Sequence, residues 1–570
     1  MGDQQIKPGI SVSKQVFDAI VVGSGISGGW AAKELCEKGL KTLVLERGRN
    51  VEHIVDYSTA NSSAWEFPHH LSNSIKDQQD NPVQSLAYNE ASKHFFVSDK
   101  EHPYIQEKPF HWIRGYQVGG RSLTWGRQSY RFSDLDFEAN LKEGIAVDWP
   151  IRYKDIAPWY DHVENFIGIS GKAEGLPHLP DGQFLPPMEM NCIEDHFSKK
   201  INEHFRDRIA TIGRVANLSK GWKGRGPCQY RNLCDRGCPF GGYFSSNAAT
   251  LPAAAQSGNM TLLPDSIVIE VIYNEEKRRA DGVRVMNAKT KEVTDYFARI
   301  IFLNASTIAT TAILLNSVSR HFPNGLGNSS GQVGHNLMDH FIGTGAIGEH
   351  DSFTEKYYSG RRPTGIYIPR FRNISKETQH SDFIRGYGYQ AMGSRMEWAA
   401  NTSHVEGFGK EFKDKLVQPG PWTFWLGAWG ETLPYFANCV MLDKEKKDQW
   451  GLPLVRINFE YHENESKMRD DIVANAEEML AVSGFKNINS YNHALPGGRA
   501  VHEMGTARMG RDPKTSVLNE FNQLHDVKNI FITDGSCMTS AGCQSPSLTY
   551  MALTARACNY AVTELKKLNL

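Results

Sequence analysis

Three cysteines lie close together in the segment GPCQYRNLCDRGCPFGG, residues 226–242. Cys228, Cys234 and Cys238 follow the spacing Cys-x5-Cys-x3-Cys-Pro, whereas the other cysteines are scattered along the 570 residues. A structural zinc site normally has four ligands, often in closely spaced pairs. Iron–sulfur clusters are held by closely spaced thiolates, and a proline can follow the last one. The three thiolates therefore predict a 3Fe–4S cluster, with zinc or unligated structural thiols as the alternatives.

A second group of residues has the order strand, glycine turn, helix, strand, acid. The apolar run at residues 19–22 is typical of a buried parallel strand. It leads into a G-x-G-x-x-G turn that comprises Gly23, Ser24, Gly25, Ile26, Ser27 and Gly28. A helical pattern follows, and the strand KTLVLE then ends at Glu46. Such a turn presents free backbone N–H groups at a helix N-terminus to phosphates, and the acid accepts ribose hydroxyls, so this order predicts a Rossmann-type dinucleotide site.

Three further segments extend the set of candidate ligand-binding residues. GYQVGGRSLTWGR, residues 115–127, is rich in glycine and small polar residues and would let the backbone approach a flat ligand. HEMGTARMG occupies residues 502–510, and the strand NIFITD delivers Asp534 and Gly535. Pro546 then opens a helical pattern, whose N-terminus would offer a second helix dipole to a ligand.

These motifs, in this order, resemble the glucose–methanol–choline (GMC) oxidoreductases over nearly the whole chain. The resemblance implies an α/β fold (α+β overall) with a Rossmann-type FAD-binding domain that is discontinuous in sequence. It also implies a substrate domain on a mostly antiparallel sheet. We expect the FAD-binding domain at residues 1–340 and 491–570, with a lid or insert at about 50–110 and an iron–sulfur loop at about 226–242, and the substrate-binding domain at 341–490.

The resemblance also assigns the cofactor contacts. The sequence ERG at residues 46–48 is similar to that of FAD-dependent enzymes. In the related pyranose oxidases a histidine of the glycine–tryptophan loop carries the flavin covalently, whereas this chain has Thr124 there, so we expect non-covalent FAD. The expected FAD-binding residues are Gly23, Ser24, Gly25, Ile26, Ser27, Gly28, Glu46, Arg47, Gly119, Gly120, Ser122, Thr124, Trp125, Gly126, Val268, Asp534, Gly535 and Pro546.

Alcohol oxidation needs a base for the hydroxyl proton and an acceptor for the hydride, which is N5 of the flavin. His502 stands where the family has its active-site histidine. The family's partner residue, a His or Asn, is replaced here by Ser545, which has only one hydroxyl with which to hold the substrate. Reduced activity, substitution by Gln544, a bridging water or an alteration of this residue in the chain would each account for the departure.

The cysteine spacing and the flanking GGYFSSNAATLPAA resemble one branch of the family, the FAD-containing large subunits of bacterial sugar dehydrogenases, and glucoside 3-dehydrogenase in particular. This implies oxidation of C3 of glucosides or disaccharides to 3-keto sugars, with electrons leaving through the cluster to a cytochrome c. A small subunit that carries the export signal is the other expected partner. The alternatives are an oxygen-using pyranose or C-glycoside oxidase, a glucose, gluconate or polyol dehydrogenase, and a non-enzymatic binding subunit.

Charge and hydropathy exclude several other classes. The chain has 63 basic and 64 acidic residues, so it offers no electrostatic reason to bind nucleic acid or an anionic membrane. No apolar run approaches the ~20 residues that span a bilayer. The N-terminal MGDQQIKPGISVSKQ lacks the apolar core of a signal peptide. We expect no transmembrane segment, and we expect carriage to the periplasm by a partner subunit, with the cytoplasm as the alternative.

Two patterns leave more than one interpretation. Trp398, Trp422, Trp425 and Trp429 fall in the predicted substrate domain, where tryptophans serve either as stacking platforms for sugar rings or as core. The segment GHNLMDH, residues 334–340, contains residue types that bind metals. In the family this segment is a flavin-domain loop.

Overall fold

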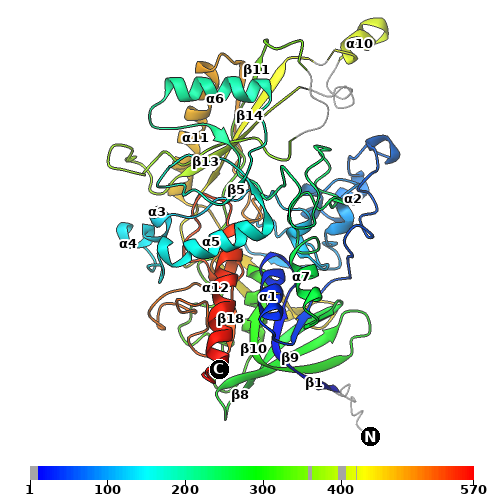
Figure 1. Cartoon of the computed structure of the whole chain (residues 1–570), viewed down its shortest axis with the longest axis vertical. Helices are drawn as coiled ribbons and strands as arrows, with labels where there is room; N and C mark the ends of the chain where they lie inside the picture. The colour runs from blue at the N-terminus through cyan, green and yellow to red at the C-terminus, as the bar shows by residue number, and fades with distance from the viewer. Residues whose placement is uncertain (1–10, 357–361, 396–405, 419) are drawn as a thin grey trace.

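The computed structural model describes residues 11–356, 362–395, 406–418 and 420–570. The molecule is elongated, with one sheet toward the lower end of Figure 1, near the C-terminus, and a second sheet toward the upper end. The residues expected to bind a ligand lie on the lower sheet and between the two sheets.

Parallel strands form the centre of the lower sheet. In spatial order β7-β2-β1-β10-β18 these are Met260–Leu263, Thr42–Leu45, Ser11–Val22, Val293–Leu303 and Ile530–Ile532. The antiparallel hairpin of β8 (Ser266–Asn274) and β9 (Arg279–Asn287) extends the sheet beyond β10. Because β18 comes from the C-terminal part of the chain, distant segments complete one sheet, as expected for a discontinuous dinucleotide domain.

Helices cover this sheet because its strands are apolar on both faces. Ile20 and Leu43 on one face and Val21 and Val44 on the other are fully buried. The helix α1 (Ile26–Glu37), which joins β1 to β2, packs against α12 (Ser547–Lys566) and α7 (Thr250–Gln256), and α12 also packs against α5 (Tyr153–Ile167). Figure 1 shows α1, α5 and α7 near the upper end of α12, which runs down beside the strands to the C-terminus.

The upper sheet is antiparallel throughout, which confirms the predicted architecture. In spatial order β17-β11-β14-β13-β12-β6 its strands are Lys486–Asn492, Thr344–His350, Trp422–Gly430, Tyr387–Arg395, Ile366–Ile368 and Thr211–Ile212. Two helices, α6 (Cys192–His204) and α11 (Glu463–Val482), pack on one face. The elements β6 and α6 come from before residue 340, so the upper sheet also draws on the first half of the chain.

Alternation along β14 places its tryptophans on two faces. Trp422 is buried with Phe424 and Leu426 in the core under the helices. Trp425 and Trp429 are half-buried on the opposite face, with their rings edge to face at 6.1 Å. Trp422 is therefore core, whereas Trp425 and Trp429 keep accessible surface. Trp398 lies outside the described residues.

Shorter elements connect the two sheets. The strand β3 (Ile105–Gln106) pairs with β16 (Pro453–Asn458), which pairs with β15 (Cys439–Lys447), and this joins the segment after residue 50 to a distant part of the chain. The other short elements are α2 (Ile75–Asp80), α3 (Asp134–Phe137), α4 (Ala139–Glu143), α8 (Thr307–Asn316), α10 (Gly409–Leu416), β4 (Ile169–Ser170), β5 (Phe184–Leu185) and the 3₁₀ turns 64–66, 84–86, 93–95, 120–123 and 535–537.

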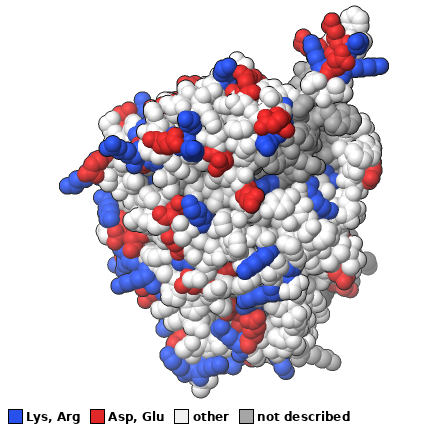
Figure 2. Space-filling view, turned by 45° about the horizontal axis from the view of Figure 1, so that its top comes forward, with Lys and Arg blue, Asp and Glu red and all other residues white. Residues whose placement is uncertain are grey.

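Acidic and basic side chains are interspersed over the face of the molecule seen in Figure 2. This distribution agrees with the net charge of −1. Among the residues that the structure describes, no helix combines the length and the apolar character needed to cross a membrane.

Candidate active site

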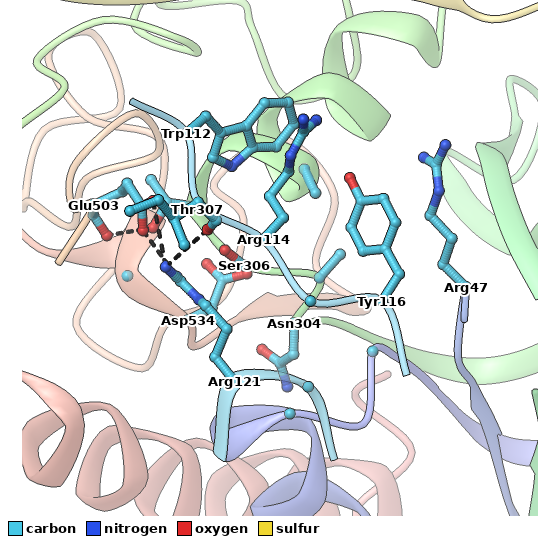
Figure 3. Close-up of a pocket in the computed structure, with 18 of the residues that line it drawn as sticks. Arg47, Trp112, Arg114, Tyr116, Arg121, Asn304, Ser306, Thr307, Glu503 and Asp534 are labelled. Carbon is cyan, nitrogen blue, oxygen red and sulfur yellow. Dashed lines mark hydrogen bonds and ion pairs between the residues drawn. The ribbon is translucent and has the colours of Figure 1, made fainter. Parts of the chain in front are cut away.

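A cavity of about 430 Å³ opens at the carboxyl ends of the parallel strands. Its wall includes the residues that follow β1, β2, β10 and β18, which is where open parallel sheets bind their ligands. Figure 3 shows side chains from several of these segments converging on the cavity. Glu46 lines one part of it and His502 another, so one continuous space joins the predicted nucleotide site to the predicted base.

Three helices begin at the cavity wall. These are α1 after Gly25, α8 after Ser306 and α12 after Pro546, and all three residues line the cavity. Free backbone N–H groups and the positive end of the helix dipole favour an anion at such a position. The α8 N-terminus was missed at the sequence level, although the strand and turn FLNAST that precede it contain a recognisable capping residue.

The glycine turn before α1 is shaped partly by the protein and partly for a ligand. Gly23 has φ +93°, and a Cβ there would lie 2.4 Å from the Asn304 carbonyl oxygen. A Cβ at Gly28 would lie 1.9 Å from the carbonyl oxygen of Gly23. A Cβ on Gly25, in contrast, would meet no protein atom within 4 Å, and Gly25 lines the cavity. No described protein atom therefore requires a glycine at position 25, which fits a backbone that must come close to a bound phosphate.

Glu46 connects the turn to the neighbouring loops. Its carboxylate accepts hydrogen bonds from the Ser24 hydroxyl at 2.6 Å and from the Gly48 backbone N–H at 3.0 Å. The Gly119 N–H in turn donates to the Ser24 hydroxyl at 3.0 Å. Burial raises the pKa of Glu46, and these hydrogen bonds oppose that shift. Glu46 and Gly119 thus help to fix the predicted nucleotide end of the cavity.

Basic and aromatic side chains line this same end. Arg47 lies over the ring of Tyr116 at 4.7 Å and is 3.6 Å from the Asp448 carboxylate. Arg114 lies over the ring of Trp112 at 4.1 Å. All five side chains line the cavity, and Figure 3 shows four of them. Flat rings and guanidinium groups suit an aromatic base and an anionic linker.

The other predicted cofactor contacts also line the cavity, with the exception of Gly28 and Gly119, which are not part of its wall. Its wall includes Ile26, Ser27, Gly120, Ser122, Thr124, Trp125, Gly126, Val268, Asp534, Gly535 and Pro546. The wall further offers donors for a ligand, because Asn304 Nδ2 and the Tyr550 hydroxyl are buried and hydrogen-bond to no described residue. Open space at Gly25 and such unpaired buried donors are what a dinucleotide site requires.

His502 lies on a loop whose backbone is fixed by hydrogen bonds to the side chain of Asp339. The Asp339 carboxylate accepts hydrogen bonds from the backbone N–H of His502 at 3.0 Å and of Gly498 at 2.7 Å. Val501, a β-branched residue, has φ +62°, a left-handed conformation that such residues rarely adopt. Arg121 forms an ion pair at 2.8 Å with Glu503, the residue that follows the histidine in the sequence. The dashed contact in Figure 3 marks this pair.

The imidazole of His502 meets that of His340. Their Nδ1 atoms are 2.8 Å apart, and His340 Nε2 is 2.7 Å from the Gly542 carbonyl oxygen. His340 is fully buried, whereas His502 keeps accessible surface toward the cavity. Burial lowers the pKa of His502 well below its usual range, and His340 and Arg121 lower it further. His502 is therefore neutral, and able to accept a proton, at pH 7.

Ser545 and Gln544 have different surroundings. Ser545 lines the cavity with His502. Gln544 is buried; its Oε1 accepts from the Cys543 backbone N–H at 3.1 Å and its Nε2 donates to Asp136 at 3.2 Å. Both polar ends of Gln544 thus bond to the protein, so the structure gives no role at the cavity to the residue expected as a substitute for Ser545.

The three closely spaced cysteines lie half-buried on their loop. The Tyr230 backbone N–H donates to Cys228 Sγ at 3.4 Å, and the Gly242 N–H donates to Cys238 Sγ at 3.3 Å. Burial, together with the neighbouring Cys234 and Cys238, raises the pKa of the Cys228 thiol to about 11. Within the described part of the chain, no three His, Cys, Asp or Glu side chains are gathered to hold a metal ion. The predicted cluster is thus not shown by a preformed set of ligands in the described residues, and the side chains of the segment 334–340 are not gathered into one there either.

A parallel sheet with a glycine turn, an acid after its second strand and a histidine base in the same cavity define a dinucleotide-dependent oxidoreductase. The sequence profile of the N-terminal part of the GMC oxidoreductases matches residues 17–342, and that of their C-terminal part matches residues 434–554. The chain belongs to the GMC oxidoreductase family. It is a FAD-dependent enzyme that acts on the CH–OH group of alcohols or sugars.

Relatives of established activity cover almost the full length of the chain. It is 29% identical to 2-methyl-1,2-propanediol dehydrogenase of Mycolicibacterium austroafricanum, over 97% of this chain and 96% of the relative. It is 24% identical to the fructose dehydrogenase large subunit of Gluconobacter japonicus, over 96% and 98%. The solved pyridoxine 4-oxidase from Mesorbium loti has the same fold, with a TM-score of 0.61 at 15% identity over 95% of this chain and 98% of that one.

Proposed function

We propose that the protein is a sugar dehydrogenase that oxidises a secondary hydroxyl, at C3 of a glucoside or disaccharide, to a ketone. The observation that carries the proposal is that His502 and Ser545 line the same cavity as the glycine turn. Two relatives act on compounds with several hydroxyls, a propanediol and fructose, and this supports a polyhydroxylated substrate. The half-buried Trp425 and Trp429 on the upper sheet are suited to stacking against a sugar ring.

The residues of the chain divide the chemistry between them. FAD, when bound, accepts the hydride from the carbon that is oxidised. The neutral His502 takes up the proton of the substrate hydroxyl, and the Ser545 hydroxyl orients that hydroxyl through one hydrogen bond. Asp339 holds the backbone of the histidine in place, and Arg121 is neutralised by Glu503.

The decisive experiment is anaerobic reduction of the purified holoenzyme by a panel of glucosides, disaccharides, fructose, gluconate and simple diols. We expect glucosides to bleach the flavin fastest, and NMR of the product to show a ketone at C3. A ketone at another carbon would overturn the position, and reduction by diols alone would overturn the sugar assignment. Fast reoxidation by dioxygen would favour the oxidase alternative.

His502→Ala tests the base within the same assay. Loss of a positioned general base typically costs ~10²–10⁴-fold in rate, so flavin reduction should slow by that factor while the FAD content stays unchanged. His335→Ala is a suitable control, because His335 stacks on Phe436 at the surface and bonds to its carbonyl, away from the cavity wall. An unchanged rate in His502→Ala would place the base elsewhere.

The route of the electrons after the flavin is the finer part of the proposal. We propose that the loop at residues 226–242 binds a 3Fe–4S cluster through Cys228, Cys234 and Cys238. In support, the loop continues directly into segments of the cavity wall: Trp125 donates to the Phe244 carbonyl at 2.9 Å, and the Ser246 backbone N–H donates to Ser122 at 3.0 Å. Besides burial, Cys234 and Cys238 raise the pKa of Cys228, and Cys238 raises that of Cys234, so a metal that neutralised these thiolates would relieve an electrostatic cost.

The proposed electron route also requires partner proteins, a small subunit and a cytochrome c. A relative whose name is that of a large subunit supports a further subunit, which would carry the export signal, and a cytochrome c is the proposed acceptor in the periplasm. Replacing each loop cysteine by Ser should remove iron and stop the reduction of an external cytochrome, while sugar still reduces the flavin. Cys192→Ser is the control: Cys192 lies on α6, which packs on the upper sheet, so this variant should keep the same iron content as the wild type. Equal iron in all four variants would exclude the cluster.

A further inference from the structure

The proton on the His502 imidazole has only two positions in its neutral form, and only one of them leaves a base facing the substrate. A neutral imidazole carries its hydrogen on Nδ1 or on Nε2, and the other nitrogen is the acceptor. Which tautomer is present is set by the hydrogen bonds that each nitrogen makes. In this protein the contacts of His502 with His340, and of His340 with Gly542, determine the tautomer of His502.

The Gly542 carbonyl oxygen can only accept a hydrogen bond. Because it lies 2.7 Å from His340 Nε2, that nitrogen carries the hydrogen and donates it. His340 is fully buried, and burial lowers its pKa, so the ring is neutral. Its Nδ1 atom therefore has a lone pair and no hydrogen.

The same reasoning continues across the contact with His502. The two Nδ1 atoms are 2.8 Å apart, and the rings are nearly perpendicular at 86°. Since His340 Nδ1 can only accept, His502 Nδ1 must donate. His502 then has its lone pair on Nε2, the other edge of a ring that lines the cavity.

We infer that His340 is a positioning residue that holds His502 in the Nδ1–H tautomer and so directs its basic Nε2 toward the substrate hydroxyl. The chain of hydrogen bonds runs from His502 Nδ1–H to His340 Nδ1, and from His340 Nε2–H to the Gly542 carbonyl. When His502 takes the hydroxyl proton on Nε2, its Nδ1–H bond to His340 persists and becomes charge-assisted. His340 itself neither gains nor loses a proton.

This arrangement differs from one in which a carboxylate orients the base. The carboxylate of Asp339 accepts from the backbone N–H of His502, whereas the imidazole Nδ1 of His502 meets His340. A neutral orienting group adds no negative charge beside the ring, which agrees with the lowered pKa of His502. The inference rests on the proposed function only for the identity of the substrate; the tautomer can be observed without one.

The first test is ¹⁵N NMR of the histidine-labelled holoenzyme at pH 7.5 in the absence of substrate. The His502 signals are assigned as those lost in His502→Asn. We expect a protonated Nδ1 and an unprotonated Nε2 in the wild type, and a mixture of both tautomers in His340→Phe. A hydrogen on His502 Nε2 in the wild type, or an unchanged tautomer in His340→Phe, would overturn the inference. Neither result depends on sugar as the substrate.

The second test is the rate of flavin reduction by whichever alcohol reduces the enzyme fastest. Loss of the correct tautomer can cost up to ~10⁴-fold in kcat, so His340→Phe should lose ~10²-fold or more with KM changed by less than about threefold. His340→Asn places its amide oxygen where Nδ1 stood and should recover at least ~10-fold of that loss.

His350→Phe is a matched control for His340→Phe, because it replaces another buried imidazole that does not contact His502. His350 on β11 is also buried, and its Nδ1 accepts from the Ser352 backbone N–H at 3.1 Å. His350→Phe should leave the rate of flavin reduction unchanged at equal FAD content. Equal losses in His350→Phe and His340→Phe, or no recovery in His340→Asn, would mean that His340 serves packing alone.

Discussion

Gly25 and Gly28 belong to one turn, yet a methyl group at the two positions would meet different surroundings. At Gly28 it would press against the Gly23 carbonyl oxygen at 1.9 Å, whereas at Gly25 it would enter open space at the cavity. The fold itself therefore requires a glycine at position 28, whereas at position 25 only the proposed approach of a bound phosphate would require one.

Gly25→Ala should therefore leave the free energy of unfolding of the apoprotein within about 0.5 kcal/mol of the wild type and weaken FAD binding at least ~10-fold. Gly28→Ala should lose about 1–3 kcal/mol of stability, because overpacking forces backbone shifts. Denaturant titration and FAD titration of the apoproteins measure both quantities. Gly221→Ala is the control, since its Cβ would make only ordinary contact, 3.6 Å from Arg225 O. Normal FAD affinity in Gly25→Ala would refute the assignment of the turn to phosphate.

Single residues differ in how far the sequence reveals them. The roles of Gly25 and Glu46 follow from a short motif, because the chemistry and the spacing lie within one βαβ unit. His340 and His502 are 162 residues apart, and neither sequence segment indicates the other. The segment 334–340 has residue types that bind metals, but Asp339 and His340 of this segment hydrogen-bond to His502 instead.

The loop that carries His502 shows how one element depends on another. The turn before β11 supplies Asp339, whose carboxylate binds the backbone of Gly498 and His502, and the backbones of Met338 and Met504 hydrogen-bond to each other at 2.9 and 2.8 Å. These bonds stabilise a loop in which Val501 has φ +62°.

The titration of Asp339 should be visible in the pH dependence of the free energy of unfolding. Burial, and then the neighbouring Glu503, raise the pKa of Asp339 to about 7, against backbone hydrogen bonds that lower it. Between its unfolded value near ~3.9 and about 7, the folded state binds more protons than the unfolded state, so the free energy of unfolding falls as pH rises through this range. The fall should approach about 1.4 kcal/mol for each unit by which the pKa is raised.

Asp339→Asn removes this titration, and it also places an amide N–H₂ against a backbone N–H. The free energy of unfolding of the variant should be lower than that of the wild type at pH 5. This difference in free energy should narrow as the pH approaches 8, because the wild type loses stability over that range. Urea unfolding of both proteins at pH 5, 6, 7 and 8 measures it. A difference that stays constant over this range would show that Asp339 is ionised throughout.

Whole elements were predictable where the local pattern was strong. The buried strands at residues 19–22 and 41–46 and the helix after Gly25 are encoded by short apolar runs and a glycine turn. The three-residue strand β12 is too short for a periodic signal, and only pairing with its neighbours defines it. The equally short β18 was predicted, because the apolar run NIFITD leads into Asp534 and Gly535. The N-terminus of α8 becomes part of the site because β10 lies beside β1 in the sheet.

At the scale of the whole molecule, the cavity wall draws on residues from Val22 to Tyr550. Strands from both ends of the chain meet in the lower sheet, and β3 pairs with β16 beside it. A ligand that fills this cavity contacts several of these distant segments at once. Because only the folded chain brings the segments together, the ligand binds the folded state and not the unfolded one.

FAD should therefore raise the unfolding temperature of the apoprotein in a concentration-dependent way, corresponding to about 2.7 kcal/mol at a free concentration 100 times Kd. Riboflavin separates the two ends of the cavity, because it lacks the pyrophosphate and adenosine that the α1 turn, Glu46 and Arg47 are proposed to hold. We expect riboflavin to give a clearly smaller shift than FAD at equal concentration, and Gly25→Ala to abolish most of the difference between them. Calorimetry of the apoprotein over a series of FAD and riboflavin concentrations measures these shifts. Equal shifts for the two ligands would show that the glycine turn does not bind the pyrophosphate, because all of the stabilisation would then come from the ring end beside His502.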